Sequence, residues 1–314
     1  MAAALAGAAT AVQARANGSM GAWLDDGLLA AFLAFSVGLV LLICLVVAGR
    51  STRAAWQRLR PELTARRLQW WQLLGGLGGA IFVLGQTVTV ATIGVALFTV
   101  CTVAGQTVGG AGVDRAGLSP GGVRPITWPR VSAAVLCIVA VAIAVSGRDS
   151  GEAVPAYIAL ALVAGLVVAF QGAFNGQVSV ATGSAVVSSL VNFVVAWTTG
   201  LVLVVGVRVV SGDPLPTPPA PWDEPFLWLG GPIGVAFTIV LGATIRPLGV
   251  LVFGLASVAG ALVGAVAVDA LAADAPPITA QLVLGVTLTF AAVALAAVPP
   301  RRPGRVPVRQ DDLS

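Results

Sequence analysis

The chain has 314 residues, of which 58% are hydrophobic and only 10% are charged, and its net charge is +4. A soluble domain carries about 25% charged residues, so this chain could not cover a water-facing surface, and its small charge gives no sign of a nucleic-acid partner. It contains neither histidine nor lysine, which excludes histidine-based metal sites, Ser-His-Asp catalysis and Schiff-base chemistry.

Apolar runs of about 20 residues, the length that crosses a bilayer as an α-helix, recur along almost the whole chain. They predict an all-α polytopic membrane protein with ten transmembrane helices. The first run has no positively charged leader, so we expect it to be retained and not removed as a signal peptide. The expected spans are residues 2–22, 27–49, 71–91, 93–113, 131–147, 155–178, 184–210, 226–245, 247–270 and 278–298.

Three longer connections separate these runs, and each has its own composition. Residues 50–67 are rich in arginine, and residues 117–130 are rich in glycine and proline. The proline-rich residues 212–225 are expected to form a stiff, extended connection outside the membrane. Residues 301–314 are polar and are expected to form a disordered cytoplasmic tail.

One polar sequence motif occurs twice in the chain. Gln13 and Asn17 recur as Gln171 and Asn175 at an offset of 158 residues. At an offset of 155 residues a second series recurs without a gap, pairing Gly75, Gly76, Gly79, Phe82, Gly94, Phe98, Gly105, Gly109 and Asp114 with Gly230, Gly231, Gly234, Phe237, Gly249, Phe253, Gly260, Gly264 and Asp269. The pattern predicts two five-helix repeats, residues 1–150 and 151–300.

An odd number of helices in each repeat has a topological consequence. The second copy enters the membrane from the opposite side, so the two repeats are expected to be inverted relative to each other, as in many secondary transporters. Arginine-rich connections mark the cytoplasmic side, and placing residues 50–67 there puts both termini in the cytoplasm. Nine of the thirteen acidic residues then lie outside, at Asp25, Asp26, Asp149, Glu152, Asp213, Asp223, Glu224, Asp269 and Asp274.

The two amide pairs are the main candidates for a substrate site. In each copy the glutamine and the asparagine stand four residues apart, which places them on one helix face. Lipid cannot satisfy their donors and acceptors, so Gln13, Asn17, Gln171 and Asn175 are expected to face the interior of the helix bundle. They serve either as hydrogen-bonding contacts between helices or as the polar lining of a substrate path.

Arg15 and Gln106 are secondary candidates for substrate contact. Arg15 lies on the face opposite the amides and, as an intramembrane charge, is a functional candidate; the alternatives are snorkelling and pairing with Asp25 or Asp26. Gln106 is a further neutral polar group inside a span. The equivalent Asp114 and Asp269 stand at helix ends, where a role at the helix terminus is favoured over a proton relay.

No signature of an enzyme accompanies these residues. The sequence has no glycine-rich phosphate loop and no paired catalytic carboxylates within a span, so neither an enzyme nor a cofactor is expected. The three cysteines, Cys44, Cys101 and Cys137, all lie in apolar runs, which favours a packing role over a disulfide or metal framework.

Two five-helix halves resemble the drug/metabolite transporter superfamily. The spacing Gly-x5-Gln-x3-Asn-Gly, followed by a distant phenylalanine, resembles the YdcZ-type inner-membrane exporters, and it reads Gly7 to Phe35 and Gly165 to Phe193 here. Gly75-Gly76 and Ala104-Gly105-Gln106 with Asp114 fit the same pattern. The resemblance implies a ten-helix carrier in a bacterial plasma membrane. Two positions depart from it: Ala261 replaces a glutamine, and Thr92 stands where a proline such as Pro247 is expected.

We therefore expect a secondary transporter, an exporter by resemblance, that moves a small polar or amphipathic metabolite or drug by alternating access. Its partners are a small-molecule substrate and the lipid bilayer, and a homodimer stays open. Coupling to protons and facilitated diffusion also both stay open. The alternatives are a channel or lipid-handling protein, or a membrane scaffold that transports nothing.

Overall fold

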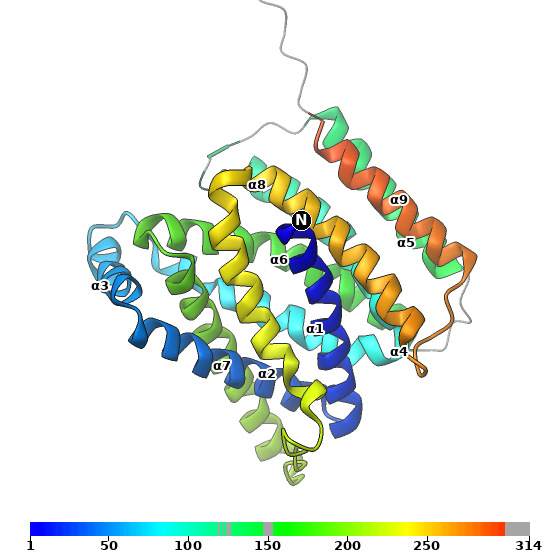
Figure 1. Ribbon diagram of the computed structural model, residues 1–314, viewed down its shortest axis with the longest axis horizontal. Helices are drawn as coiled ribbons and strands as arrows, with labels where there is room; N and C mark the ends of the chain where they lie inside the picture. The colour runs from blue at the N-terminus through cyan, green and yellow to red at the C-terminus, as the bar shows by residue number, and fades with distance from the viewer. Residues whose placement is uncertain (119, 121, 124–126, 147–152, 299–314) are drawn as a thin grey trace, which may run out of the picture.

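The computed structural model describes residues 1–118, 120, 122–123, 127–146 and 153–298, and for residues 241–255 it describes only the backbone. These residues form helices and connections, with no β-strand among them. The expected tail at residues 301–314 lies outside the described residues. The elements are α1 (Ala2–Leu24), α2 (Gly27–Ala48), α3 (Arg50–Thr64), η1 (Trp70–Leu74), α4 (Gly75–Arg115), α5 (Trp128–Ser146), α6 (Val154–Thr182), α7 (Ala185–Ser211), η2 (Pro225–Leu229), α8 (Gly230–Leu271) and α9 (Ala280–Ala296), shown in Figure 1.

Within the described chain, five helical segments are long and apolar enough to cross a membrane: α2, Trp70–Arg115, α5, α6 and α7. Large apolar side chains on the outside of the bundle remain exposed, with Val40 at 61% and Val202 at 65%. Such a surface is unfavourable in water and is the ordinary outer surface of a protein in lipid. The chain is therefore an all-α polytopic membrane protein.

Two tight turns join neighbouring helices in the same way. Between α1 and α2, Asp25 adopts a left-handed conformation (φ 49°), and the Asp26 carboxylate accepts a hydrogen bond from the Leu29 N–H at 2.9 Å. Between α6 and α7, Gly183 is left-handed (φ 71°), and the Ser184 hydroxyl oxygen accepts from the first turn of α7. A side-chain cap satisfies a backbone donor that lipid would leave unpaired.

The long helices α4 and α8 are both bent. In α4 the bend lies at Gly94, with φ 78° and ψ 161°, a conformation that is essentially restricted to glycine. This break separates the two runs that the sequence predicts at 71–91 and 93–113. Helix α8 likewise covers the runs predicted at 226–245 and 247–270, and Figure 1 shows it as two arms that meet at a sharp bend.

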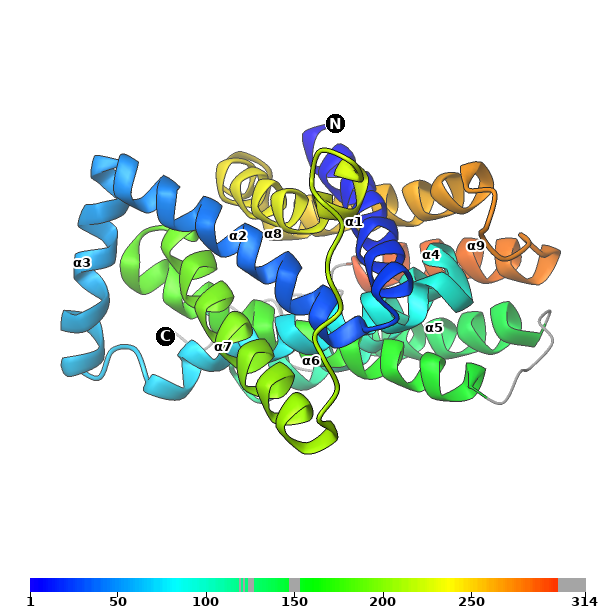
Figure 2. The same ribbon diagram turned by 90° about the horizontal axis from the view of Figure 1, so that it is seen from below.

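The helices associate in pairs that are distant in sequence (Figures 1 and 2). Helix α1 packs along α8, α4 along α6, α2 against α7 and α5 against α9. Glycines allow the closest approaches, because a β-carbon at Gly105 would overlap the Leu162 carbonyl oxygen and one at Gly260 would overlap the Ala4 carbonyl oxygen. Small residues are the usual means of bringing helix backbones together in a membrane.

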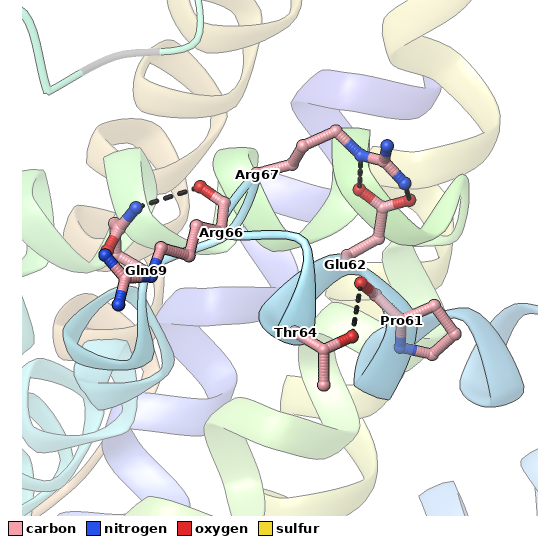
Figure 3. Close-up of polar contacts among 6 residues, drawn as sticks. All are labelled: Pro61, Glu62, Thr64, Arg66, Arg67 and Gln69. Carbon is pink, nitrogen blue, oxygen red and sulfur yellow. Dashed lines mark hydrogen bonds and ion pairs between the residues drawn. The ribbon is translucent and has the colours of Figure 1, made fainter.

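The arginine-rich connection at 50–67 is mostly helical, which the sequence analysis did not predict. Helix α3 stands at one end of the molecule, at a steep angle to α2 (Figure 2). Its following turn is held by Arg67, whose guanidinium donates two hydrogen bonds of 2.8 Å to the Glu62 carboxylate (Figure 3). These bonds lower the pKa of the Glu62 carboxyl. Leu68 then inserts against α6 and α7 and is 2% exposed.

Candidate functional site: a central amide-lined cavity

A cavity of about 460 Å³ lies where α1, α2, α4, α6, α7 and α8 meet. Its size suits a small organic molecule, and the described lining includes no charged side chain. The aromatic part of the wall consists of Phe35, Phe82, Phe98, Phe193 and Phe237. The amide part consists of Gln13, Gln86, Gln106, Gln171, Asn175 and Asn192.

Four of the predicted site residues line this cavity: Gln13, Gln106, Gln171 and Asn175. They come from three helices, α1, α4 and α6, which meet there although they are distant in sequence. No described residue is hydrogen-bonded to the amides of Gln13 or Gln106, so both retain donors and acceptors toward the cavity.

The structure does not bring Asn17 and Arg15 to the cavity. Asn17 is 2% exposed, and its Nδ2 donates a 2.7 Å hydrogen bond to Oε1 of Gln86. Arg15 is 8% exposed on the other face of α1 and forms an ion pair with Asp274, not with the Asp25 or Asp26 that the sequence suggested. One turn along α1 thus separates a cavity-lining amide from a packing amide.

Asn192 is the functional candidate that the sequence analysis missed. It is 5% exposed, and its Oδ1 accepts two hydrogen bonds, from Gln171 Nε2 at 3.0 Å and from Asn175 Nδ2 at 3.2 Å. The available signal was an asparagine inside the apolar run 184–210. It was overlooked because its equivalent in the first repeat, at the offset of 158, is Ala34.

The aromatic wall joins α2 to α7. The rings of Phe35 and Phe193 meet edge to face, with centroids 5.4 Å apart and planes at 76°, an arrangement that contributes about 0.5–1.5 kcal/mol beyond its buried area. Phe82 and Phe98 also pair, with centroids 5.7 Å apart. The cavity therefore has a broad apolar wall in addition to its amides.

The cavity is closed along the C-terminal part of α1. A β-carbon at Gly18 would lie 2.8 Å from the Val90 β-carbon, and one at Gly21 would overlap the Thr87 carbonyl oxygen, so α1 and α4 touch directly there. Two ion pairs also join a helix of one part of the chain to a connection of the other: Arg15 on α1 pairs with Asp274, and Arg208 on α7 pairs with Asp26.

The carboxylate of Asp269 binds backbone N–H groups of α4. It accepts hydrogen bonds from the N–H groups of Val95 (2.9 Å) and Ala96 (2.7 Å), directly after the bend at Gly94. A carboxylate suits the positive end of a helix. The equivalent Asp114 accepts a 2.6 Å hydrogen bond from Arg130. Neither carboxylate lines the cavity.

The comparisons with known proteins identify a family for the chain. No curated protein and no solved structure matched the chain. A family model described as "Putative inner membrane exporter, YdcZ" matches residues 1–143 and again residues 156–295, and so covers most of the chain in two copies. The chain therefore belongs to the YdcZ family of inner-membrane exporters in the drug/metabolite transporter superfamily.

Proposed function

We propose that this protein is a secondary transporter that exports a small polar or amphipathic molecule by alternating access. Two inverted five-helix halves, residues 1–150 and 151–300, would move relative to each other around the central cavity. One observation carries the proposal: amides from both halves, Gln13 on α1 and Gln171 with Asn175 on α6, line a single cavity.

Repeated contacts support the two-halves arrangement. Gly105 of the first half packs on Leu162 of the second, and the equivalent Gly260 of the second half packs on Ala4 of the first. The cavity repeats the pattern: a β-carbon at Gly79 would lie 3.0 Å from Gln171 Nε2, and one at Gly234 would lie 3.0 Å from Gln13 Nε2. Such reciprocity is expected of two copies related by a twofold axis.

Ten crossings follow if the arms of α4 and of α8 each cross the membrane. The bend at Gly94 then lies at one surface, where Asp269 caps the new arm. Arginine-rich α3 and the α6–α7 turn at Gly183 lie at the other surface, which the arginines assign to the cytoplasm. Under this topology both termini are cytoplasmic.

The position of the cavity supports access from the cytoplasmic side in this state. Its lining reaches Ser179 and Ala185 beside the α6–α7 turn, on the proposed cytoplasmic side. On the proposed outer side, the ion pairs Arg15–Asp274 and Arg208–Asp26 join the two halves. We infer that this state takes up substrate from the cytoplasm and that release outside requires these contacts to separate.

The test is substrate flux in proteoliposomes. Compounds from metabolite and drug libraries that raise the melting temperature of the purified protein would be assayed for counterflow with the wild type and with the double variant Gln171→Ala, Asn175→Ala. We expect saturable counterflow for the wild type and its loss in the folded double variant. The matched control is Gln281→Ala, at an exposed position on α9, which should transport normally. Wild-type flux in the double variant would remove these amides from the site.

A further inference from the structure

The three cavity-lining amides of the second half, Gln171, Asn175 and Asn192, form one cluster around Asn192, and their hydrogen-bonding capacity can be counted. A side-chain amide has two N–H donors and a carbonyl oxygen with two lone pairs. Asn192 Oδ1 accepts one hydrogen from Gln171 and one from Asn175, which fills its lone pairs. The interactions inside the cluster therefore use the oxygen of Asn192 and one donor from each neighbour.

What remains available is a mixed set of groups on the cavity wall. Among the described residues, no acceptor is bonded to Asn192 Nδ2, and no donor is bonded to Gln171 Oε1 or Asn175 Oδ1. Asn192 is thus left only as a donor, whereas Gln171 and Asn175 each present a free carbonyl oxygen beside it together with their second N–H. A ligand that satisfies both must itself offer an acceptor and a donor on neighbouring atoms, because a buried polar group left unpaired costs about 1–3 kcal/mol.

Three hydroxyl groups of the cavity wall already donate their hydrogens to backbone carbonyl oxygens and can offer a ligand only acceptors. Ser188 donates its hydrogen to the Asn175 carbonyl oxygen at 2.7 Å, and Ser189 donates to the Ala185 carbonyl oxygen at 2.8 Å. Thr99 does the same to the Val95 carbonyl oxygen at 2.8 Å. Their free lone pairs can accept from an N–H of the ligand but cannot neutralise a charge.

The rest of the described wall disfavours an ionised ligand. It contains the phenylalanines named above and neutral amides, and among its described residues there is no charged side chain. Moving an ion from water into such a site without a counter-charge is strongly unfavourable, whereas a flat apolar body would contact the rings of Phe35 and Phe193.

We propose that the cluster of Gln171, Asn175 and Asn192 binds an uncharged molecule with a carboxamide-like group, which has a carbonyl oxygen and an N–H on neighbouring atoms, attached to an aromatic or other apolar body. Asn192 is the specificity-determining residue, because it provides the donor for the carbonyl oxygen of the ligand. The assignment of this ligand class as the transported cargo rests on the proposed function, whereas its binding does not.

A matched series of small probes tests the ligand class on the purified full-length protein at neutral pH. Benzamide carries the complete group, acetophenone only the acceptor, benzoate a negative charge and benzamidinium a positive charge. Thermal unfolding measured against probe concentration gives the apparent affinity of each. We expect benzamide to bind at least about tenfold more tightly than the other three, which corresponds to about 1.4 kcal/mol.

A change of Asn192 should invert this order. In Asn192→Asp the two N–H donors that serve Oδ1 would stabilise a carboxylate, so the variant should gain at least about tenfold in affinity for benzamidinium and lose benzamide binding. A gain of binding requires folded protein, so misfolding cannot imitate this result. Gln281→Glu adds a carboxylate at an exposed position on α9 and should keep the wild-type order.

The outcomes separate the ligand class from transport. The class is overturned if benzamide fails to stabilise the wild type, if benzoate or benzamidinium stabilises it equally, or if Asn192→Asp leaves the order unchanged. Counterflow of the same probes in proteoliposomes addresses the proposed function. If benzamide binds but shows no saturable flux, the proposed transport function is refuted and the proposed ligand class is retained. If neutral and charged probes show the same saturable flux, the ligand class is refuted and the transport function is retained.

Discussion

The two amide pairs are identical in sequence, yet they meet different surroundings in the fold. On α1, Asn17 is buried and bonded to Gln86, whereas on α6 the equivalent Asn175 lines the cavity and joins Asn192. The cause lies in the partners: the residues equivalent to Gln86 and Asn192, at the repeat offsets, are Leu241 and Ala34. A duplicated motif can therefore be buried in helix packing in one copy and line a cavity in the other, according to which neighbour is polar.

The largest loss of stability is expected from changes at the close glycine contacts that both copies share. Gly105→Val and Gly260→Val each force a side chain into a backbone carbonyl of the facing helix, so we expect each to destabilise the protein by about 3 kcal/mol or more. The measurement is the folded fraction after extraction and heating. Gly206→Val is the control, because a β-carbon there meets nothing within 4 Å. Wild-type stability in either variant would contradict the close approach.

Replacing the equivalent asparagines of the two copies should have different effects on stability and on probe binding. Asn17→Leu leaves Gln86, which is 1% exposed, buried without its donor, so we expect a loss of about 1–3 kcal/mol in stability. Asn175→Leu leaves the Gln171–Asn192 bond intact and should lower the melting temperature less while it weakens probe binding more. Thermal unfolding and probe titration of both variants measure the contrast, and equal losses in the two copies would argue against it.

The closed end of the cavity should respond only weakly to the loss of one ion pair. Arg15→Gln removes the contact with Asp274, whose side chain is 79% exposed, so the closed end should open more often, but only by about 1.5- to 5-fold, as expected for about 0.2–1 kcal/mol. With Gln13→Cys in a Cys44→Ser background, labelling by a membrane-impermeant thiol reagent added outside reports this opening. Gln13→Cys with Arg15 intact is the reference. Unchanged labelling would separate Arg15 from the closure.

The smallest expected effect is a pH-dependent loss of local stability in the turn after α3, a helix that has no counterpart between α7 and η2 in the second half. The Glu62 carboxyl has a lowered pKa because Arg67 donates hydrogen bonds to its ionised form. The stabilisation of this turn is therefore complete above the unfolded-state pKa of Glu62 and is lost as the pH falls through the lowered folded-state pKa. Hydrogen exchange across residues 61–68, corrected for intrinsic rates, should accelerate in that acidic range. In Glu62→Gln this acceleration should be absent, while the rest of the molecule keeps its exchange pattern.

Residue periodicity and spacing predicted much of the fold and part of the candidate site. The apolar runs correspond to helices, and the gap between 91 and 93 coincides with the bend at Gly94, because helix length and glycine conformation are local properties. The Arg15–Asp274 pair, the Asp269 cap and Asn192 were not predicted, because they depend on which helices meet. Helix α3 was missed since its arginines resemble those of a loop, although its apolar residues recur on one face.

The bond between Asp269 and the start of the second arm of α4 also bears on biosynthesis. Asp269 accepts a hydrogen bond from the N–H of Val95, and the two residues are 174 positions apart in the sequence. At about 5–20 residues per second, the ribosome would need on the order of 10 to 30 seconds to add that length of chain. During this interval the arm has been synthesised but lacks its cap, so water, lipid headgroups or the insertion machinery must satisfy the Val95 and Ala96 donors. The helix that Gly94 begins is thus completed only after almost the whole chain has left the ribosome.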